Sequence, residues 1–449
     1  MAKSRSQFIC QQCGASFSKW AGKCENCGEW NSLVEQVISS GGSSAVDKSA
    51  GRGKALKTAS VREAVAESGL ERLSTGIDDL DVVLGGGFLA GGVVLVAGQP
   101  GIGKSTLLAQ VAAYIAGSKS VLYVSGEESI SQVKLRAERL GAADSEKLRL
   151  ASSNSAEDIA ASIQQGGYDL VIVDSVQTIS LSEISSAPGS VSQITNSSNV
   201  IIRAAKSSGT AVILVGHVTK EGSIAGPKIL EHLVDVVLNF EGDRYGGFRV
   251  VRAQKNRYGS TNEAAIFEMD DQGLRIVNNP SAELLAERQN LDGSIVLATM
   301  EGARPLLVEI QALVNPTNFG YPKRTASGFD LNRLNLLVAV LEKRTKLKLA
   351  DKDIYVNVVG GLKLNDPAAD LAVAMAIASA SAGRSLDEGA VVFGEIGLGG
   401  EVRSAINWQA RIKEAEKLGF TYAIAPKVHK DKFIKGVSDM RQALIDYLQ

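Results

Sequence analysis

The sequence predicts an α/β protein whose middle region is built on a parallel sheet, and three observations lead to this prediction. First, apolar runs of strand length at 93–97, 121–124, 169–174 and 211–215 alternate with stretches long enough to form helices. Second, a glycine-rich turn joins the first of these runs to a helix-like stretch. Third, polar residues follow the ends of the runs, where open α/β sheets bind their ligands.

Length and composition bound the domain organisation. A chain of 449 residues is too long for one core, and we predict a metal-binding module at 1–35, a flexible Ser/Gly-rich linker at 36–59, the parallel-sheet domain at 60–285 and a further domain at 286–449. The formal net charge of −1 means that any nucleic-acid surface must be a local patch. No apolar run could span a bilayer and no signal-peptide pattern is present, so we expect a cytoplasmic protein without membrane partners.

The glycine-rich turn at 98–105 has the G-x-x-x-x-G-K-[ST] pattern of nucleotide phosphate loops. In such a loop, backbone N–H groups and the N-terminus of the following helix converge on phosphate oxygens. We expect Lys104 to reach the β- and γ-phosphates of ATP and the Ser105 hydroxyl to bind Mg²⁺. The predicted nucleotide-binding residues are Gly98, Gln99, Pro100, Gly101, Ile102, Gly103, Lys104, Ser105 and Thr106.

Acidic residues follow two other predicted strands. Asp174 closes the run at 169–174 and has the Walker B arrangement, so we predict it as the second Mg²⁺ ligand. Glu127 follows the run at 121–124 and could orient or deprotonate the water that attacks the γ-phosphate. Glu128 competes for that role, although it also fits an acid at the start of the next helix. His217, at the end of the last run, is either a γ-phosphate sensor or an ordinary loop histidine.

All four cysteines lie within the first 27 residues. Cys10 and Cys13 form one Cys-x-x-Cys pair, and Cys24 and Cys27 form a second one ten residues later. Four thiolates in two such pairs suit tetrahedral Zn²⁺, as in a zinc ribbon, although the intervening stretch is shorter than the commonest ribbon spacing. Two disulfides are the alternative interpretation.

Three further stretches are candidates for DNA or phosphate contacts. The polar stretch at 180–199 and the glycine-rich loop after His217, which carries Lys220 and Lys228, could line a channel for single-stranded DNA; two ordinary long loops are the alternative. Lys255 and Arg257 follow a strand predicted at 248–253, on a segment expected to be extended, so both cations should point the same way. They could meet a phosphate of a neighbouring subunit, or form a solvated basic hairpin.

These motifs together resemble the bacterial RadA (Sms) family of DNA-repair proteins over the whole chain. The resemblance rests on the four-cysteine start, the phosphate loop and the pentapeptide Lys255, Asn256, Arg257, Tyr258, Gly259. It implies a RecA-like ATPase core in a hexameric ring, with ATP hydrolysis stimulated by single-stranded DNA. It also implies branch migration of recombination intermediates beside the RecA recombinase. By the same resemblance, Glu127 is the catalytic glutamate, and Lys255 and Arg257 act on a neighbour's nucleotide.

The region 286–449 resembles the α+β domain of Lon proteases. A strand at 353–358 and a proline precede an alanine-rich helix, which we expect to pack closely and to build the ring interface. In Lon-type proteases a serine follows that proline and a lysine activates it. Here Ala368 stands at the serine position and Gln409 at the lysine position. Covalent catalysis would have no nucleophile, so we expect the domain at 286–449 to have a structural role as a scaffold.

Two other function classes compete with a DNA motor. The first is a nucleotide-switched regulatory ATPase, similar to the circadian-clock ATPases, which would ignore DNA. The second is an ATP-dependent protease, which Ala368 and Gln409 argue against.

Overall fold

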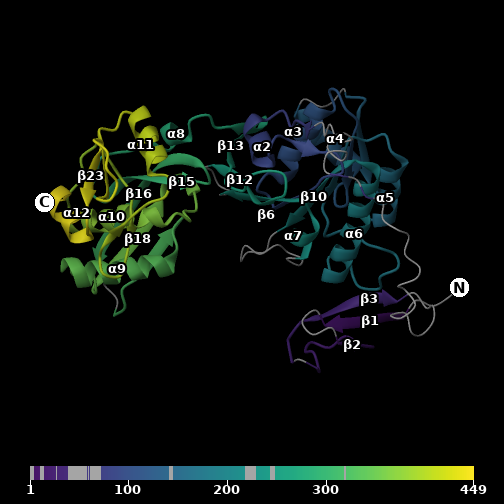
Figure 1. Ribbon diagram of the computed structural model, residues 1–449, viewed down its shortest axis with the longest axis horizontal. Helices are drawn as coiled ribbons and strands as arrows, with labels where there is room; N and C mark the ends of the chain where they lie inside the picture. The colour runs from purple at the N-terminus through teal and green to yellow at the C-terminus, as the bar shows by residue number, and fades with distance from the viewer. Residues whose placement is uncertain are drawn as a thin grey trace. The chain divides into compact units, whose positions relative to one another are not determined.

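The computed structural model describes residues 5–10, 15–26, 28–38, 58, 60, 72–140, 145–217, 229–242, 248–317 and 320–448. Contacts within the chain divide it into two compact units (Figure 1). The first contains Met1–Gly76, Gly86–Gln99 and Lys104–Val237, and the second contains Ile77–Gly85, Pro100–Gly103 and Leu238–Gln449. The domain boundaries expected at residues 35, 59 and 285 stay predictions.

The N-terminal module is a small antiparallel sheet in the order β2-β1-β3. Its strands are β1 (Arg5–Cys10), β2 (Ser16–Phe17) and β3 (Leu33–Ile38). The buried side chains of Cys10, Cys24 and Leu33 form its centre, with Phe8 and Phe17 packed against them. Because so few apolar residues are buried here, the described part of the module lacks the core of an ordinary domain, as expected for a fold that depends on a metal.

The first unit carries the predicted parallel sheet, with strand order β6-β10-β9-β7-β8. All four neighbouring pairs are parallel, and β6, β7, β9 and β10 are almost fully buried, which explains their continuous apolar sequences. The strands are β6 (Val93–Gly98), β7 (Val121–Ser125), β8 (Leu148–Ser152), β9 (Leu170–Asp174) and β10 (Ala211–His217). The α/β class is confirmed.

Helices connect these strands, and a short antiparallel pair precedes them. The helices are α3 (Lys104–Ile115), α4 (Ile130–Arg139), α5 (Ala156–Gln165), α6 (Val191–Ser208) and α7 (Ile229–Leu233), and the pair is β4 (Arg72–Leu73) with β5 (Phe88–Leu89). The expectation of a loop across 180–199 is wrong for its second half, because α6 begins at Val191. The Ser190 side chain caps this helix by accepting from the Gln193 N–H, and Ile194 and Ile201 face the core. Because the stretch is rich in serine, its composition indicates a loop, and the helical spacing of Ile194 and Ile201 was not recognised.

The second unit begins with strands in the order β14-β13-β12-β11, of which β12, β13 and β14 pair antiparallel. They are β11 (Val236–Gly242), whose first two residues belong to the first unit, β12 (Arg249–Asn256), β13 (Ala264–Asp270) and β14 (Gly273–Ile276). Helix α2 (Asp78–Leu84) packs against β12 and β13 and ends at Gly85, whose φ of 81° gives a left-handed cap.

The rest of the second unit is a mixed sheet in the order β17-β18-β16-β15-β19-β22-β23. Its strands are β15 (Ser294–Glu301), β16 (Arg304–Pro316), β17 (Arg324–Ser327), β18 (Lys352–Val358), β19 (Ala390–Val392), β22 (Tyr422–Pro426) and β23 (Ile434–Val437). A small sheet pairs β20 (Glu395–Ile396) with β21 (Val402–Arg403). The helices are α8 (Pro280–Leu285), α9 (Leu331–Thr345), α10 (Asp370–Ala382), α11 (Trp408–Lys417) and α12 (Met440–Tyr447), with single turns at Val359–Gly361 and Pro367–Ala369.

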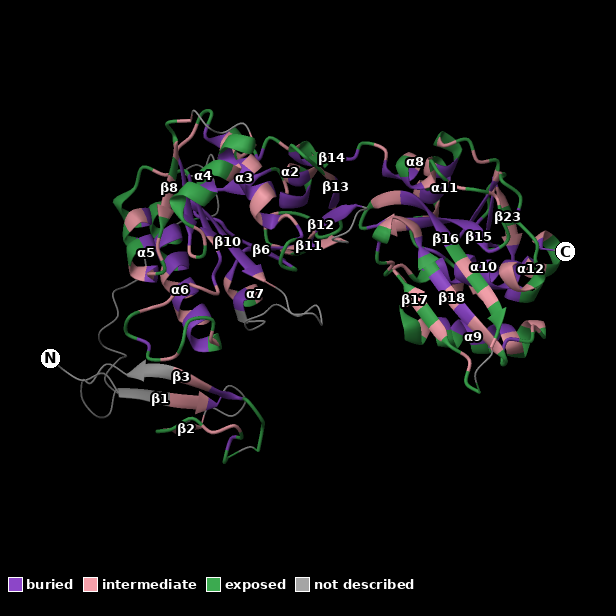
Figure 2. Cartoon of the chain, turned by 180° about the vertical axis from the view of Figure 1, so that it is seen from behind, coloured by how far each residue is buried: buried purple, intermediate pink, exposed green. Residues whose placement is uncertain are grey.

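The alanine-rich helix α10 lies inside its own chain. Every residue from Asp370 to Ser379 is buried, and the helix packs on β15 and β16 (Figure 2). A helix covered in this way cannot form a ring interface, so that expectation is wrong. Its small side chains instead allow close approach to the sheet. No helix in the described ranges has the length and apolar character needed to cross a bilayer.

Candidate nucleotide-binding site

The parallel strand register brings the predicted site residues to one edge of the sheet. His217, the last residue of β10, pairs with Gly98, the last residue of β6. Asp174, the last residue of β9, pairs with Ser125, the last residue of β7, and with Val215 of β10. The phosphate loop and the residues that follow β7, β9 and β10 therefore share the carboxyl edge, as the sequence predicts.

The phosphate loop leads directly into α3, which begins at Lys104. Its glycines at 101 and 103 have φ values of 77° and 116°, a conformation that favours glycine. The Lys104 side chain is buried, and its ammonium donates to the carbonyl oxygens of Gly98 at 2.8 Å and Gln99 at 3.0 Å. The cation is thus held over the loop that would receive a phosphate.

His217 connects Lys104 to Glu127. The Lys104 ammonium lies 3.2 Å from His217 Nδ1, and because an ammonium has no acceptor, Nδ1 must accept and the neutral ring carries its proton on Nε2. That Nε2 lies 3.7 Å from Glu127 Oε1. Burial and the nearby Lys104 charge lower the pKa of His217, which favours this neutral form. His217 therefore lies between two of the predicted site residues, and its role as a γ-phosphate sensor stays a prediction.

The structure separates Glu127 from Glu128. Glu127 Oε1 accepts a hydrogen bond from the Ser175 hydroxyl at 2.6 Å, beside the end of β9. Glu128 instead pairs with Arg136 of α4, the helix that Ser129 caps. The geometry thus favours Glu127 as the carboxylate available to the reaction, whereas Glu128 is engaged by Arg136; the roles predicted for both residues stay predictions.

Asp174 has a partner that sequence reasoning missed. The hydroxyl of Tyr123, a buried residue of β7, donates to Asp174 Oδ2 at 2.6 Å. Burial, followed by the Asp174 charge, raises the pKa of Tyr123 well above its ordinary value. The available signal in the sequence was a single phenol in an otherwise apolar strand. The Ser105 hydroxyl and the Asp174 carboxylate are the oxygen ligands that Mg²⁺ prefers, so the donor set fits that ion.

The pentapeptide at 255–259 is docked on α2 of its own chain. The Asn256 amide donates to the Val83 carbonyl at 3.1 Å, and its Oδ1 accepts from the Tyr258 N–H at 2.8 Å. A Cβ on Gly259 would lie 2.8 Å from the Gly85 Cα, so only glycine allows this approach. The asparagine and the glycine thus fix the segment that carries the two cations.

The expected geometry of the two cations needs correction. Strand β12 continues to Asn256, so Lys255 belongs to the strand, whereas Arg257 lies in the bend after it and is exposed. The two residues are not on one extended segment, because the strand ends at Asn256 and the chain bends at Arg257. Both lie in the second unit, whereas Lys104, Glu127 and Asp174 lie in the first. A role on a neighbouring subunit's nucleotide stays a prediction.

Cys10 and Cys24 make equivalent backbone hydrogen bonds, each to the carbonyl five residues later. The N–H of Cys10 donates to the Ala15 carbonyl at 2.8 Å, and the N–H of Cys24 donates to the Glu29 carbonyl at 2.8 Å. Both thiols are buried in one cluster, and Cys10 Sγ lies 3.2 Å from Ser32 Oγ. Cys13, Cys27, Lys220 and Lys228 lie outside the described residues.

In the second unit, a buried ion pair joins the two segments that would carry protease chemistry. Arg411, two residues after Gln409, donates to Asp366 Oδ2 at 2.6 Å, two residues before Ala368. Burial alone would raise the pKa of Asp366, but the hydrogen bond and charge of Arg411 hold it below the usual value. Ala368 is buried and Gln409 is exposed. Because these residues are an alanine and a glutamine, the two positions provide neither a hydroxyl nor an amine.

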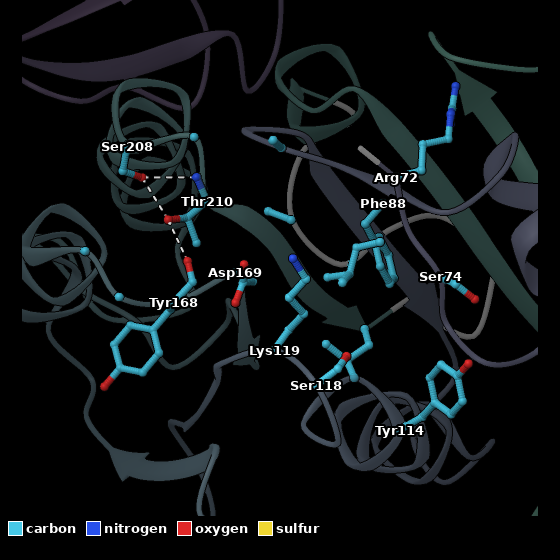
Figure 3. Close-up of a pocket in the computed structure, with 17 residues that line it drawn as sticks. Arg72, Ser74, Phe88, Tyr114, Ser118, Lys119, Tyr168, Asp169, Ser208 and Thr210 are labelled. Atoms are coloured by element: carbon cyan, nitrogen blue, oxygen red, sulfur yellow. Dashed lines mark hydrogen bonds between the residues drawn. The ribbon is translucent and has the colours of Figure 1, made fainter. Parts of the chain in front are cut away.

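A hollow of about 650 Å³ lies at the other edge of the parallel sheet (Figure 3). Lys119, Asp169 and Thr210, which line it, directly precede or lie just before β7, β9 and β10. Because these are the amino ends of the strands, this hollow is separate from the phosphate loop.

Comparisons with known proteins agree with this organisation. A family described as AAA domain matches residues 62–223, one described as Rubredoxin metal binding domain matches 8–35, and one described as Subunit ChlI of Mg-chelatase matches 335–429. The first supports ATP hydrolysis and the second supports a metal in the cysteine module. A crystal structure of the RadB recombinase matches with a TM-score of 0.37 and 24% identity, over 46% of this chain and 100% of that one, a similarity too low to bear on the fold.

Three relatives of similar length are each named DNA repair protein RadA. The DNA repair protein RadA of Bacillus subtilis (strain 168) is 48% identical over 453 residues, which cover 99% of each protein. That of Brucella abortus (strain 2308) is 48% identical over 95% of this chain and 92% of its own length. That of Pseudomonas aeruginosa is 47% identical over 95% and 94%. These relatives do not favour the clock-type or protease alternatives. With almost half of its residues identical along nearly its whole length, the chain belongs to the RadA family of DNA repair proteins.

Proposed function

We propose that this chain is a motor of recombinational DNA repair that hydrolyses ATP when single-stranded DNA is bound and drives branch migration of intermediates made by the RecA recombinase. The observation that carries the proposal is the connected set Lys104, His217, Glu127 and Ser175 at the carboxyl edge of the sheet. One histidine there lies 3.2 Å from the phosphate-binding cation and 3.7 Å from the candidate base. Such a link would let the state of the phosphate alter the carboxylate and the loop after β10.

The nucleotide step follows from the contacts of Lys104. When a triphosphate enters the loop, the ammonium exchanges its contacts with the Gly98 and Gln99 carbonyls for the β- and γ-phosphates. His217 Nδ1 then loses its donor and can respond to the γ-phosphate. Glu127, oriented by Ser175, orients or deprotonates the attacking water. Ser105 and Asp174 would hold Mg²⁺, which when bound neutralises phosphate charge.

Coupling between subunits would come from the pentapeptide. In a hexameric ring, Lys255 and Arg257 would contact the γ-phosphate held by a neighbouring chain and stabilise charge that develops during its transfer. The docking of Asn256 and Gly259 on α2 supports this role, because it places the cations on a rigid support.

Two further parts of the proposal concern metal and DNA. Cys10, Cys13, Cys24 and Cys27 would bind Zn²⁺, which would supply the stability that the small module lacks. Lys220 and Lys228 would contact DNA phosphates from the loop after β10, so binding should weaken steeply as salt concentration rises.

The test is a comparison of neighbouring carboxylates. ATP hydrolysis is measured with and without a single-stranded oligonucleotide for the wild type, Lys104→Ala, Glu127→Gln and Glu128→Gln. We expect Lys104→Ala to abolish nucleotide binding and Glu127→Gln to lower kcat by about 10²–10⁴-fold with nucleotide binding retained. Glu128→Gln is the matched control and should stay within about threefold. A larger loss in Glu128→Gln, or hydrolysis that ignores DNA in the wild type, would contradict the proposal.

The role between subunits needs its own experiment. Lys255→Ala chains, with an intact phosphate loop, are mixed with Lys104→Ala chains, with an intact pentapeptide. If the cations act on a neighbour, mixed oligomers should regain hydrolysis that neither variant shows alone. A lack of recovery in oligomers shown to be mixed would refute action in trans.

A further inference from the structure

Tyr123 lies where it can control the geometry of Asp174. It is the middle residue of β7 and is only 2% exposed. In the register with β9, Ser125 pairs with Asp174 and Tyr123 pairs with Ile172, so Tyr123 stands two residues behind the carboxyl edge. Two residues of a strand span about 6.6 Å, a step that a phenol ring can bridge. Its hydroxyl reaches Asp174 Oδ2 at 2.6 Å.

A buried hydroxyl at this position requires a reason. Val121, Leu122 and Val124 have apolar side chains and only the terminal Ser125 of the strand is polar besides Tyr123, so a phenylalanine at 123 would serve packing equally well. A hydroxyl buried without a partner is costly, and Asp174 is the one partner it has among the described residues. Burial and the Asp174 charge keep the pKa of Tyr123 high, so the phenol remains a donor at neutral pH.

The bond settles which carboxylate oxygen remains available. The terminal torsion of an aspartate is soft, so the carboxylate rotates unless something holds it. The Tyr123 hydroxyl engages Oδ2, and Oδ1 has no hydrogen-bond partner among the residues that the structure describes. This arrangement presents Oδ1 at the carboxyl end of β9, on the same edge of the sheet as the phosphate loop that follows β6.

We propose that Tyr123 is a positioning residue that holds the Asp174 carboxylate in the orientation needed to bind Mg²⁺ with the nucleotide. The inference rests on the proposed role of Asp174. Partners that hydrogen-bond a metal ligand typically contribute about 10–100-fold in metal affinity or activity. Tyr123 therefore acts through Asp174 and need not touch the nucleotide.

The experiment measures how much Mg²⁺ strengthens nucleotide binding. Binding of a fluorescent ADP is titrated in EDTA and at increasing Mg²⁺ for the full-length wild type, Tyr123→Phe and Tyr168→Phe. The last is the matched control, because the Tyr168 hydroxyl has no hydrogen-bond partner among the described residues and its ring points away from Ser208 and Thr210 (Figure 3). We expect Tyr123→Phe to bind ADP normally in EDTA, and to need about tenfold or more Mg²⁺ for half-maximal enhancement. Tyr168→Phe should match the wild type.

A double-mutant cycle separates positioning from packing. In an Asp174→Ala background the Mg²⁺ enhancement should already be lost, and adding Tyr123→Phe should change nothing further. Direct binding of Mn²⁺, followed by its EPR signal, provides a readout independent of hydrolysis. If Tyr123→Phe lowers the melting temperature but leaves the Mg²⁺ dependence unchanged, the inference is wrong. If Asp174→Ala itself leaves that dependence unchanged, the proposed role of Asp174 fails instead.

Discussion

The buried ion pair between Arg411 and Asp366 provides a quantitative test of how the second unit is held together. Arg411 is almost fully buried, and its guanidinium donates to Asp366 Oδ2 at 2.6 Å, to the Ala298 carbonyl at 2.7 Å and to the Ile406 carbonyl at 3.1 Å. Arg411→Met keeps most of the volume but leaves the carboxylate buried without its counter-charge. Removing one partner of such a pair costs about 3–5 kcal/mol.

The remaining contacts of Asp366 place the expected loss at the lower end. Its carboxylate still accepts from the Thr299 hydroxyl at 3.0 Å and from the backbone N–H groups of Met300 at 3.1 Å and Ala368 at 3.0 Å. We therefore expect about 3 kcal/mol for Arg411→Met and a similar loss for Asp366→Asn. The double variant should lose about 3–4 kcal/mol rather than the sum of about 6, because it buries no unpaired charge.

The assay is urea unfolding followed by the fluorescence of Trp408, which stacks on His429 in this unit. Trp20 and Trp30 are 58% and 68% exposed and can be replaced by phenylalanine, so that one fluorophore reports. In thermal unfolding followed by the same fluorophore, a loss of about 3 kcal/mol should lower the melting temperature of a domain of this size by about 6–12 °C. Additive single losses, with a coupling energy below about 0.5 kcal/mol, would refute the reasoning.

The same pair predicts a pH dependence. Because the native pKa of Asp366 lies below its ordinary value of 3.8, the native state binds fewer protons than the unfolded state in this range. Its contribution to stability is therefore present above about pH 3.8 and is lost as the pH falls through the native pKa. In Arg411→Met the largest influences that lower the pKa of Asp366 are lost, while burial still raises it, so the acid transition should move to higher pH, which unfolding curves at pH 3–6 would detect.

Three further predictions concern other sites. Gly259→Ala should clash with Gly85 and lower ATP hydrolysis while ADP binding at the phosphate loop persists; equal hydrolysis would mean that the docked turn is unimportant. Because burial and Lys104 depress the native pKa of His217 below 6.5, its contribution to stability should be full above pH 6.5 and fall as the pH drops below it, and His217→Gln should flatten this part of the curve. Ala368→Ser alone should yield no cleavage of casein, because Gln409 supplies no base; measurable cleavage would revive the protease alternative.

The sequence alone determined the features that contiguous residues encode. The phosphate loop, the apolar strands beside it and the residues that follow them are local patterns, and parallel pairing then requires their carboxyl ends to meet. The sequence also shows directly that position 368 is not a serine and position 409 is not a lysine, because these are statements of residue identity. The serine-rich start of α6 was not readable, since its cap at Ser190 competes with a loop of the same composition.

Tertiary structure decided the choices that depend on partners far apart in the chain. Glu127 and Glu128 are adjacent and chemically alike, and only their contacts with Ser175 and Arg136 distinguish them. The Tyr123 hydroxyl meets a carboxylate 51 residues away, and Asn256 meets the end of a helix 173 residues away. No periodicity in the sequence indicates such a pair. A hydrogen bond needs two groups within about 3 Å of each other, and only the folding of the whole sheet brings these groups that close.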